Sequence, residues 1–390
     1  MTGPPQPPGH ILCVVGARPN YMKMAPLVRA FAGRPELPRT MLVHTGQHYD
    51  VAMNERLFAD LELPAPDVNL EVGSATHAVQ TAEVMRRFEP LLDELRPCCI
   101  VVVGDVNSTL ACSLVAAKKG IAVVHVEAGL RSYDREMPEE INRVLTDQIA
   151  GLLYTTERCA ADNLLREGIS AERIRFVGNV MIDSLVRHRQ RAIAPIDTLA
   201  RAGLTGECIG GAVGYGVVTL HRPSNVDDAS ALAESLSVLR EVARRLPLVW
   251  PVHPRARANI ERFGLSAALT GSAITLLPPQ GYLEMLGLMA NARLVLTDSG
   301  GIQEETTALA VPCLTMRDNT ERPITVDQGT NTLVGRNVEQ TLACVDAVFA
   351  GGGKRGRVPE LWDGCAADRI ATDLTTWLGL SNERRQVVNA

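Results

Sequence analysis

Short apolar runs alternate with amphipathic stretches along most of the chain, and this alternation limits the possible folds most strongly. The amphipathic stretches, for example 108–119, 139–150 and 229–246, place apolar residues three and four positions apart, as helices with one buried face do. Apolar strands separated by such helices are typical of parallel sheets covered on both faces. The sequence therefore predicts an α/β fold, with strands at 10–16, 40–45, 99–104, 122–126, 152–155, 174–177, 216–220, 248–253, 274–277, 294–297 and 311–316.

A chain of 390 residues is long enough for about two domains. A helix-like stretch at 180–191 leads into Ala-Ile-Ala-Pro and a glycine-rich segment before strands resume. We therefore predict a first domain at 1–190 and a second domain at 191–365. The last amphipathic stretch has no strand after it, so residues 366–390 are predicted to pack back on the first domain.

The charge balance argues against several classes of partner. Lys and Arg number 39 and Asp and Glu number 44, which gives a net charge of −5 and disfavours binding to nucleic acid or anionic lipid. No apolar run approaches the roughly 18–20 residues of a membrane span, and no signal peptide is visible. The nine cysteines show no metal-ligand spacing, so we expect reduced thiols, no bound metal and a cytoplasmic protein.

Ligands of open parallel sheets bind at the carboxyl ends of strands, and the first strand end is unusual. It reads Gly16-Ala-Arg-Pro, with one glycine where a dinucleotide fold has GxGxxG, and no Walker A pattern occurs in the chain. We therefore expect no nicotinamide cofactor. Arg18 and Lys23 follow the strand, and they are either a pair of cations for a diphosphate or ordinary surface residues.

Three carboxyl groups follow the next elements of the first half. Asp105 ends a strand and could act only as a helix cap, whereas Glu127 lies in an apolar strand and could form an ion pair with Arg131. Glu139 opens a helix, where an acid suits the helix dipole. Carboxyl groups gathered at one sheet edge also supply acid and base, because such clusters separate pKa values.

The second half contains a strand that ends in Ser299-Gly300-Gly301 and passes directly into a helix. Small residues there let a phosphate approach main-chain N–H groups at the positive end of the helix dipole. Glu305, about one turn further on, is placed to accept hydrogen bonds from ribose hydroxyls. A tight turn with an N-cap is the alternative, and His221 at another strand end adds a candidate catalytic group.

Taken together, these motifs resemble those of the non-hydrolysing UDP-N-acetylglucosamine 2-epimerases, in the family's order and over nearly the whole chain. The motifs are Gly16-Ala-Arg-Pro, Gly104-Asp, His125-Val-Glu-Ala-Gly-Leu-Arg, Pro138-Glu-Glu, His221-Arg, Asp298-Ser-Gly-Gly-Ile-Gln-Glu-Glu and Glu321-Arg-Pro. The resemblance implies a GT-B fold, in which two Rossmann-like domains with parallel sheets face each other across a cleft. It also implies a homodimer without NAD or metal.

The resemblance further implies interconversion of UDP-GlcNAc and UDP-ManNAc, by elimination of UDP to 2-acetamidoglucal and re-addition. By match to the family's motifs, Asp105, Glu127 and Glu139 are the acid/base carboxylates, and His221 is catalytic or contacts phosphate. The residues implied in binding are Arg18, Lys23, Ser299, Gly300 and Gly301 for the diphosphate, Glu305 for the ribose, and Gln280 and Arg322 for nucleotide or sugar. Gln47 and His48 resemble part of the allosteric site at which a second UDP-GlcNAc binds in bacterial members.

The chain departs from the family in three motifs. Ala17 and Asn20 stand where many members have Thr and Glu, Met285 stands where some have an aromatic residue, and Ile324 follows the Arg-Pro motif in place of Glu. These departures leave the exact sugar open. A hydrolysing epimerase that releases UDP and ManNAc, a retaining GT-B glycosyltransferase and a catalytically silent nucleotide-sugar-binding regulator are the alternatives. The three carboxylates favour elimination chemistry over transfer and over a silent protein.

Overall fold

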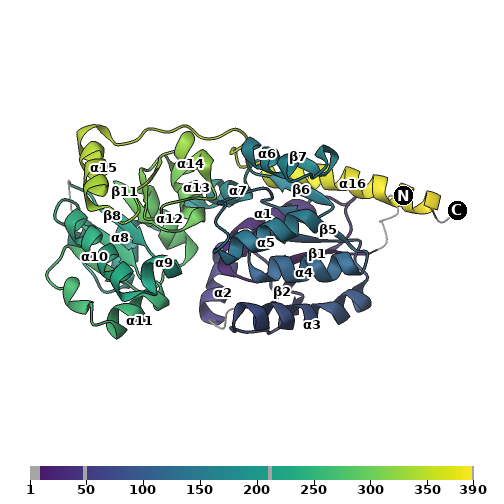
Figure 1. Cartoon of the computed structure of the whole chain (residues 1–390), viewed down its shortest axis with the longest axis horizontal. Helices are drawn as coiled ribbons and strands as arrows, with labels where there is room; N and C mark the ends of the chain where they lie inside the picture. The colour runs from purple at the N-terminus through teal and green to yellow at the C-terminus, as the bar shows by residue number, and fades with distance from the viewer. Residues whose placement is uncertain (1–8, 47–50, 210–212, 389–390) are drawn as a thin grey trace. The chain divides into compact units, whose positions relative to one another are not determined.

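The computed structural model describes residues 9–46, 51–209 and 213–388 of the chain (Figure 1). The chain forms two compact units. Unit 1 contains the residues up to Arg187 together with those from Glu360 onward, and unit 2 is His188–Pro359. The predicted boundaries, after residues 190 and 365, lie beside these divisions.

Unit 1 is built on a seven-stranded parallel sheet with the strand order β3-β2-β1-β4-β5-β6-β7. Its elements are β1 (Ile11–Val15), α1 (Arg18–Ala32), β2 (Thr40–His44), α2 (Val51–Asp60), β3 (Val68–Asn69), α3 (His77–Leu95), β4 (Cys99–Val103), α4 (Asn107–Lys118), β5 (Ala122–Val126), α5 (Pro138–Ile149), β6 (Leu152–Thr155), α6 (Arg158–Arg166), β7 (Ile174–Phe176), α7 (Val180–His188, which ends at the boundary) and α16 (Ala366–Val388).

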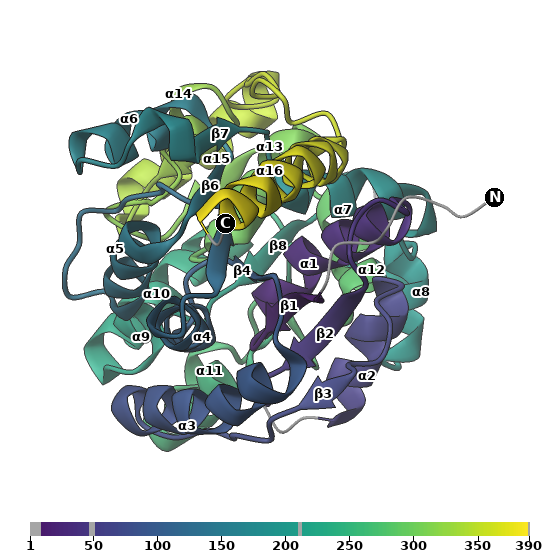
Figure 2. The ribbon, with the colours of Figure 1, turned by 90° about the vertical axis from the view of Figure 1, so that its right-hand side faces the viewer.

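Helices cover both faces of this sheet, which explains why its central strands are apolar throughout. Every residue of β1 and β4 is buried. Figure 2 shows α3, α4 and α5 on one side of the strands and α1, α2 and α16 on the other. Phe88 of α3 packs against Leu12 and Ile100 of the sheet in one apolar cluster. Burial of each such side chain stabilises the fold by roughly 1.5–3 kcal/mol.

Helix α16 joins unit 1 through contacts with α1 and through hydrogen bonds of Asp373 with residues of β6 and β7. The Asp183 carboxylate accepts hydrogen bonds from the main-chain N–H groups of Ala366 (3.1 Å) and Ala367 (2.7 Å), at the first turn of α16. The Tyr154 hydroxyl donates to Asp373 on the same helix at 2.9 Å. These contacts account for the return of the chain to unit 1 after unit 2.

Unit 2 is built on a six-stranded parallel sheet with the strand order β10-β9-β8-β11-β12-β13. Its elements are α8 (Pro195–Arg201), β8 (Gly216–Thr219), α9 (Pro223–Val226), α10 (Ala229–Ala243), β9 (Leu248–Pro251), α11 (Pro254–Arg262), β10 (Ile274–Leu277), α12 (Tyr282–Ala290), β11 (Leu294–Thr297), α13 (Gly300–Leu309), β12 (Cys313–Thr315), α14 (Pro323–Asp327), β13 (Asn331–Leu333) and α15 (Val338–Gly351).

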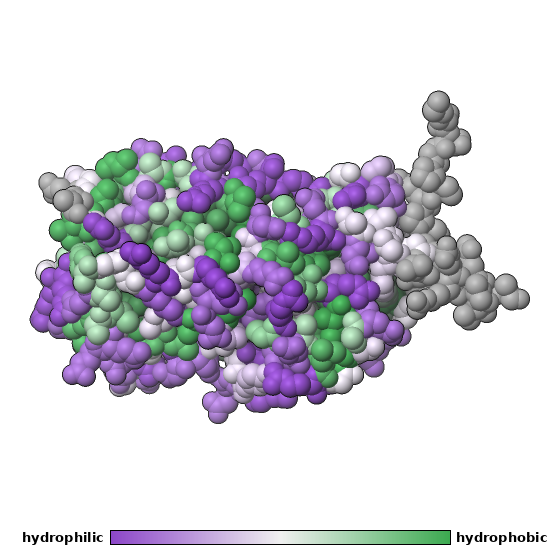
Figure 3. Space-filling model, turned by 90° about the horizontal axis from the view of Figure 1, so that it is seen from above, coloured by the Kyte–Doolittle hydropathy of each residue, from purple (hydrophilic) through white to green (hydrophobic). Residues whose placement is uncertain are grey.

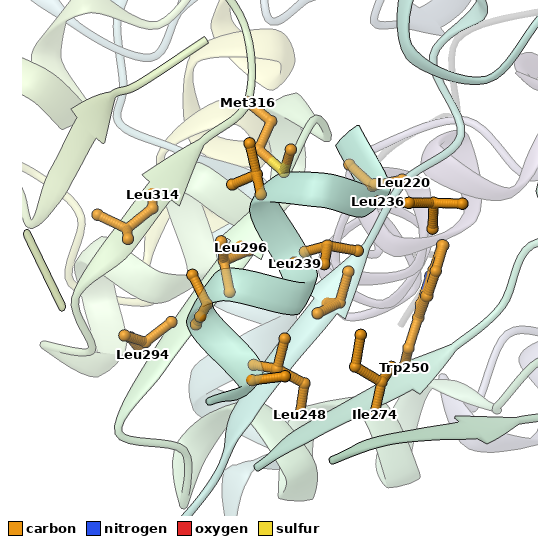
Figure 4. Packing of buried hydrophobic residues seen from close by; sticks show 14 of the residues in the cluster. Leu220, Leu236, Leu239, Leu248, Trp250, Ile274, Leu294, Leu296, Leu314 and Met316 are labelled. Carbon is orange, nitrogen blue, oxygen red and sulfur yellow. The ribbon is translucent and has the colours of Figure 1, made fainter. Parts of the chain in front are cut away.

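The larger core of unit 2 lies between its sheet and α10 (Figure 4). Leu236 and Leu239 of α10 pack with Trp250 and Leu296 of the strands, and all four side chains are almost fully buried. Asp228 caps α10 by accepting hydrogen bonds from the main-chain N–H groups of its first turn. The opposite face of the sheet is covered by a second cluster that includes residues of α8 and α12.

The predicted α/β fold with parallel sheets is confirmed, although two edge strands escaped prediction. Strands β3 and β13 have two and three residues, too few to show an apolar pattern. Among the described residues, no helix is long and apolar enough to cross a membrane. Hydrophilic and hydrophobic residues are interspersed over the face shown in Figure 3.

Candidate active site

The turn between β1 and α1 is held by one buried amide side chain. Asn20 Oδ1 accepts hydrogen bonds from the main-chain N–H groups of Gly16 and Ala17, both at 3.1 Å. Its Nδ2 donates to the carbonyl oxygen of Val103 at the end of β4, at 2.9 Å. Asn20 therefore links the ends of two neighbouring strands. Arg18 opens α1 and is partly exposed.

The Lys23 ammonium lies 2.6 Å from Glu127 Oε1, and both side chains are at most 5% exposed. Glu127 follows β5 with a φ of 72°, a left-handed conformation that costs a non-glycine residue about 1–3 kcal/mol. Its main-chain N–H donates to the Tyr154 carbonyl oxygen at 3.0 Å. A Cβ on Gly104 would lie 3.0 Å from Lys23 Nζ, so a glycine at the end of β4 makes room for this ion pair.

Arg131, which was one possible partner for Glu127, forms different ion pairs. Its guanidinium lies 2.8 Å from Asp147 and 2.6 Å from Glu167. The interpretation of Arg131 and Glu127 as a structural pair was therefore wrong. Lys23, one helical turn into α1, is the cation beside the Glu127 carboxylate, which sequence spacing could not reveal because 104 positions separate the two residues.

Asp105, at the end of β4, faces a cation from α5. Its Oδ2 accepts hydrogen bonds from Arg143 Nη2 at 2.6 Å and from Nε at 3.2 Å. The N-cap of α4 is Val106, and the Arg143 contacts give the Asp105 carboxylate a partner that a simple helix cap does not have. Arg143 was missed as a site residue, and its position four residues after Glu139 on an amphipathic helix was the signal that could have found it.

The two acids that open α5 have different surroundings. Glu140 is 1% exposed and accepts hydrogen bonds from the main-chain N–H groups of Ser132 (2.9 Å) and Tyr133 (3.0 Å). It also pairs with Arg143. Glu139 is only partly buried. Glu140 therefore orders the loop before α5, whereas Glu139 remains the candidate for acid/base chemistry.

Three of the predicted residues meet at one edge of the unit 1 sheet. Val103 and Val126 are register partners in β4 and β5, so the residues that follow these strands, Asp105 and Glu127, leave the sheet side by side. Asn142 of α5 donates a hydrogen bond to the Asp105 carbonyl oxygen at 2.9 Å, which attaches the helix to the same edge. Lys23 joins them through its ion pair.

In unit 2, buried Asp298 fixes the strand end that carries His221. The carboxylate accepts hydrogen bonds from the main-chain N–H groups of His221 (3.0 Å) and Arg222 (2.9 Å), and His221 Nδ1 lies 2.9 Å from it. Burial alone opposes ionisation of Asp298, but the His221 ring and these N–H groups hold the pKa of its carboxyl below the usual value. The His221 side chain is 41% exposed, so it can reach a ligand.

The first turn of α13 has the geometry of an anion site. Ser299 is its N-cap and makes no side-chain cap, and Gly300 and Gly301 begin the helix. The Arg322 guanidinium lies 2.6 Å from Glu321. A Cβ on Gly300 would stand 2.5 Å from Arg322 Nη1 and from Glu321 Oε1, so glycine leaves room for both side chains beside this turn.

Glu305 lies further along α13 and is 4% exposed. Burial raises the pKa of its carboxyl to about 7, and the neighbouring Tyr282 hydroxyl partly opposes that shift. Gln280 lies in the loop between β10 and α12, where its amide donates to the Pro278 carbonyl oxygen at 2.7 Å. Because β10 is the edge strand, Gln280 is displaced along the sheet from the α13 turn, which follows β11.

Two further predictions concern an allosteric site and the absence of a bound metal. Gln47 and His48, the predicted allosteric residues, lie outside the described residues. Within the described part of the chain, no cluster of three or more His, Cys, Asp or Glu side chains is arranged to hold a metal ion.

Comparison of the sequence with known proteins identifies the family to which the chain is similar. A family model described as UDP-N-acetylglucosamine 2-epimerase matches residues 32–375. The UDP-N-acetylglucosamine 2-epimerase of Methanocaldococcus jannaschii is 41% identical over 369 residues, which cover 93% of this chain and 98% of that protein. The UDP-2,3-diacetamido-2,3-dideoxy-D-glucuronate 2-epimerase of Pseudomonas aeruginosa is 41% identical over 83% of this chain and 88% of its own length.

Solved structures agree with the sequence comparisons. The crystal structure of the Methanocaldococcus jannaschii UDP-GlcNAc 2-epimerase in complex with UDP-GlcNAc and UDP matches with a TM-score of 0.83 and 38% identity, over 94% of this chain and 99% of that one. The two parallel-sheet α/β units are thus of the GT-B type seen in these neighbours. With a family match over most of its length and relatives about 40% identical, this chain belongs to the UDP-N-acetylglucosamine 2-epimerase family.

Proposed function

We propose that this protein is a non-hydrolysing epimerase that interconverts UDP-GlcNAc and UDP-ManNAc. The observation that carries the proposal is the placement of Asp105 and Glu127. They follow adjacent strands, each beside a buried cation, in a chain 41% identical to a UDP-N-acetylglucosamine 2-epimerase. Carboxyl groups held in different environments at one edge are suited to serve as acid and base.

The proposed chemistry couples removal of the non-acidic C2 proton to the departure of UDP, so that no free carbanion forms at C2. A base takes the proton from the sugar C2 while the C1–O bond to UDP breaks, and the electron pair of the C2–H bond forms a C1=C2 double bond. UDP leaves with the electron pair of the C1–O bond, which gives 2-acetamidoglucal. In the return step UDP adds to C1 as an acid protonates C2 on the other face. This route needs an acid, a base and stabilisation of the diphosphate.

In this proposal Asp105, Glu127 and Glu139 are the acid/base groups. The buried ammonium of Lys23, 2.6 Å from Glu127 Oε1, orients this carboxylate. Arg143 does the same for Asp105 from α5.

The proposal assigns UDP mainly to unit 2. The main-chain N–H groups of Gly300 and Gly301 and the hydroxyl of Ser299 bind the diphosphate at the positive end of α13, since the Ser299 N–H already donates to Thr297 Oγ1 at 3.0 Å. The binding residues outside this turn are His221 toward phosphate, Glu305 toward the ribose, Gln280 and Arg322 toward nucleotide or sugar, and Arg18 and Lys23 from unit 1 toward the diphosphate.

Incubation with UDP-GlcNAc in D2O separates this function from its alternatives. We expect NMR to show deuterium at C2 in a mixture of both UDP-sugars. Stoichiometric free UDP and ManNAc would indicate a hydrolysing epimerase, and binding without exchange would indicate a transferase or a silent binding protein. A parallel incubation with UDP-2,3-diacetamido-2,3-dideoxy-D-glucuronate tests the substrate named for the Pseudomonas aeruginosa relative.

We also propose that the protein is a cytoplasmic homodimer. An open hollow of about 450 Å³ with a mainly apolar lining lies between α3, α4 and α5. Ile141 in this lining is 43% exposed, and Leu145 on the same helix is 47% exposed. A second copy could bury such side chains. Light scattering after gel filtration, with Ile141→Lys as the disrupting variant and Val186→Lys as a control on an exposed residue of α7, tests this state.

A further inference from the structure

His125, the residue two positions before Glu127, lies between two hydrogen-bond acceptors and is fully buried. Its Nδ1 is 2.7 Å from Asp147 Oδ1, and its Nε2 is 2.8 Å from the carbonyl oxygen of Gly104. A carbonyl oxygen and a carboxylate oxygen only accept hydrogen bonds. Each ring nitrogen therefore faces a hydrogen-bond acceptor, and a ring that makes both contacts as a donor carries a proton on each nitrogen.

The second oxygen of Asp147 extends this contact to the next loop. Asp147 Oδ2 accepts a hydrogen bond from the main-chain N–H of Gly129 at 3.1 Å and lies 2.8 Å from Arg131 Nη1. Arg131 pairs in turn with Glu167. The Arg131 guanidinium thus lies between two carboxylates, and such pairing is the condition under which charged groups are tolerated in a protein interior.

The two main-chain groups that this network holds flank the proposed acid/base residues. Gly104 immediately precedes Asp105, and Gly129 follows Glu127 by two positions. Glu127 itself has a left-handed backbone, which persists only where the surroundings fix it. The hydrogen bonds of His125 and Asp147 therefore connect the loop that carries Asp105 with the loop that carries Glu127.

We infer that His125 and Asp147 are positioning residues, which set the separation and orientation of Asp105 and Glu127 through the Gly104 carbonyl and the Gly129 N–H. This inference rests on the proposed function, because it concerns the carboxylates assigned to proton transfer. Neither His125 nor Asp147 is assigned contact with substrate. Their contribution is to geometry, and a displacement of about 1 Å at a reacting group can lower a rate about 10²-fold.

Asp147→Asn provides a conservative variant that keeps the connections. Its Oδ1 can accept from Gly129 and Arg131, and its Nδ2 can donate to His125 Nδ1, while the ring still donates to Gly104 from Nε2. We expect kcat for UDP-GlcNAc within about threefold of wild type in this variant. Asp147→Ala and His125→Ala break the connection, and we expect each to lower kcat about 10²-fold.

Controls separate positioning from general destabilisation. Because UDP is assigned to unit 2, the KM for UDP-GlcNAc and the calorimetric affinity for UDP should change less than threefold in all three variants. Trp362→Phe removes another buried hydrogen bond of unit 1, from Trp362 Nε1 to the Thr156 carbonyl oxygen at 3.0 Å. We expect this matched variant to lower the melting temperature and leave kcat unchanged.

The wild-type ring is tested without any activity assay. In protein labelled with ¹⁵N-histidine, we expect NMR signals for a proton on both nitrogens of His125, assigned by their loss in His125→Ala, and a single ring proton in Asp147→Asn. Absence of a proton on Nε2 in wild type would overturn the inference, because the ring would then not donate to the Gly104 carbonyl oxygen. So would normal kcat in folded His125→Ala, or equal losses in Asp147→Asn and Asp147→Ala. Absence of UDP-sugar turnover in wild type would contradict the proposed function, while the ring measurement still decides the network.

Discussion

Lys23 and Glu127 form a buried ion pair, 2.6 Å apart, between the first turns of α1 and the end of β5. Few positions in unit 1 combine a charge, near-complete burial and a left-handed backbone as Glu127 does. Such a combination is costly for folding and needs specific partners. The Lys23–Glu127 ion pair is therefore expected to affect both the stability of the protein and the proposed proton transfer.

Replacement of Lys23 by Met should destabilise the protein by about 3 kcal/mol, because the buried carboxylate of Glu127 loses its ammonium partner. Equilibrium unfolding in urea measures this change. The double variant Lys23→Met/Glu127→Gln should recover most of the loss, since it also removes the buried charge. A single variant as stable as wild type would show that the ion pair contributes little.

The acid/base assignment predicts a clear separation between turnover and binding. Asp105→Asn and Glu127→Gln should each lower kcat by about 10²–10⁴-fold, the range expected for loss of a general acid or base. UDP affinity, measured by calorimetry, should stay near wild type. Near-normal turnover in both variants would remove these residues from the proposed mechanism.

The neighbours Glu139 and Glu140 should respond to the same substitution in opposite ways. Glu140→Gln should lower the free energy of unfolding by about 1–3 kcal/mol, because Glu140 holds Ser132, Tyr133 and Arg143. Glu139→Gln should leave stability within about 0.5 kcal/mol and lower kcat by about 10²-fold or more. Thermal unfolding and turnover assays compare the pair, and the reverse pattern would exchange their roles.

Removal of the Glu305 charge should stabilise the protein by an amount that depends on pH. Burial raises the pKa of this carboxyl to about 7, so its favourable contribution is complete below the pKa of the unfolded chain and is lost as pH rises through about 7. Glu305→Gln should therefore raise the melting temperature at pH 8, by an amount that corresponds to about 3 kcal/mol at most, and have little effect at pH 5.

The same substitution should weaken UDP binding at pH 8, because the amide is a poorer acceptor for ribose hydroxyls than a carboxylate. Calorimetric titration with UDP measures this loss, and titration with inorganic diphosphate is the control that leaves out the ribose. Equal losses for both ligands would place the effect of Glu305 at the diphosphate.

The fold was predictable because the hydrophobic patterns that indicate strands and helices lie within short segments of the sequence. Apolar runs and amphipathic stretches gave the α/β alternation, and even the Ser299-Gly300 turn was visible in the sequence. The partners of the site residues were not, because Lys23 with Glu127 and Asp105 with Arg143 join segments that only the sheet brings together. Glu140 was also indistinguishable from Glu139 by residue type, since burial separates them.

The return of α16 to unit 1 has a consequence for how the protein is made. Unit 2 is inserted between α7 and the last helix, so unit 1 lacks α16 until the whole of unit 2 has left the ribosome. The groups of α16 that form hydrogen bonds with Asp183 and Tyr154 are then synthesised last. Unit 2 is therefore synthesised before unit 1 is complete. Until α16 is synthesised, the face of unit 1 that binds this helix stays uncovered.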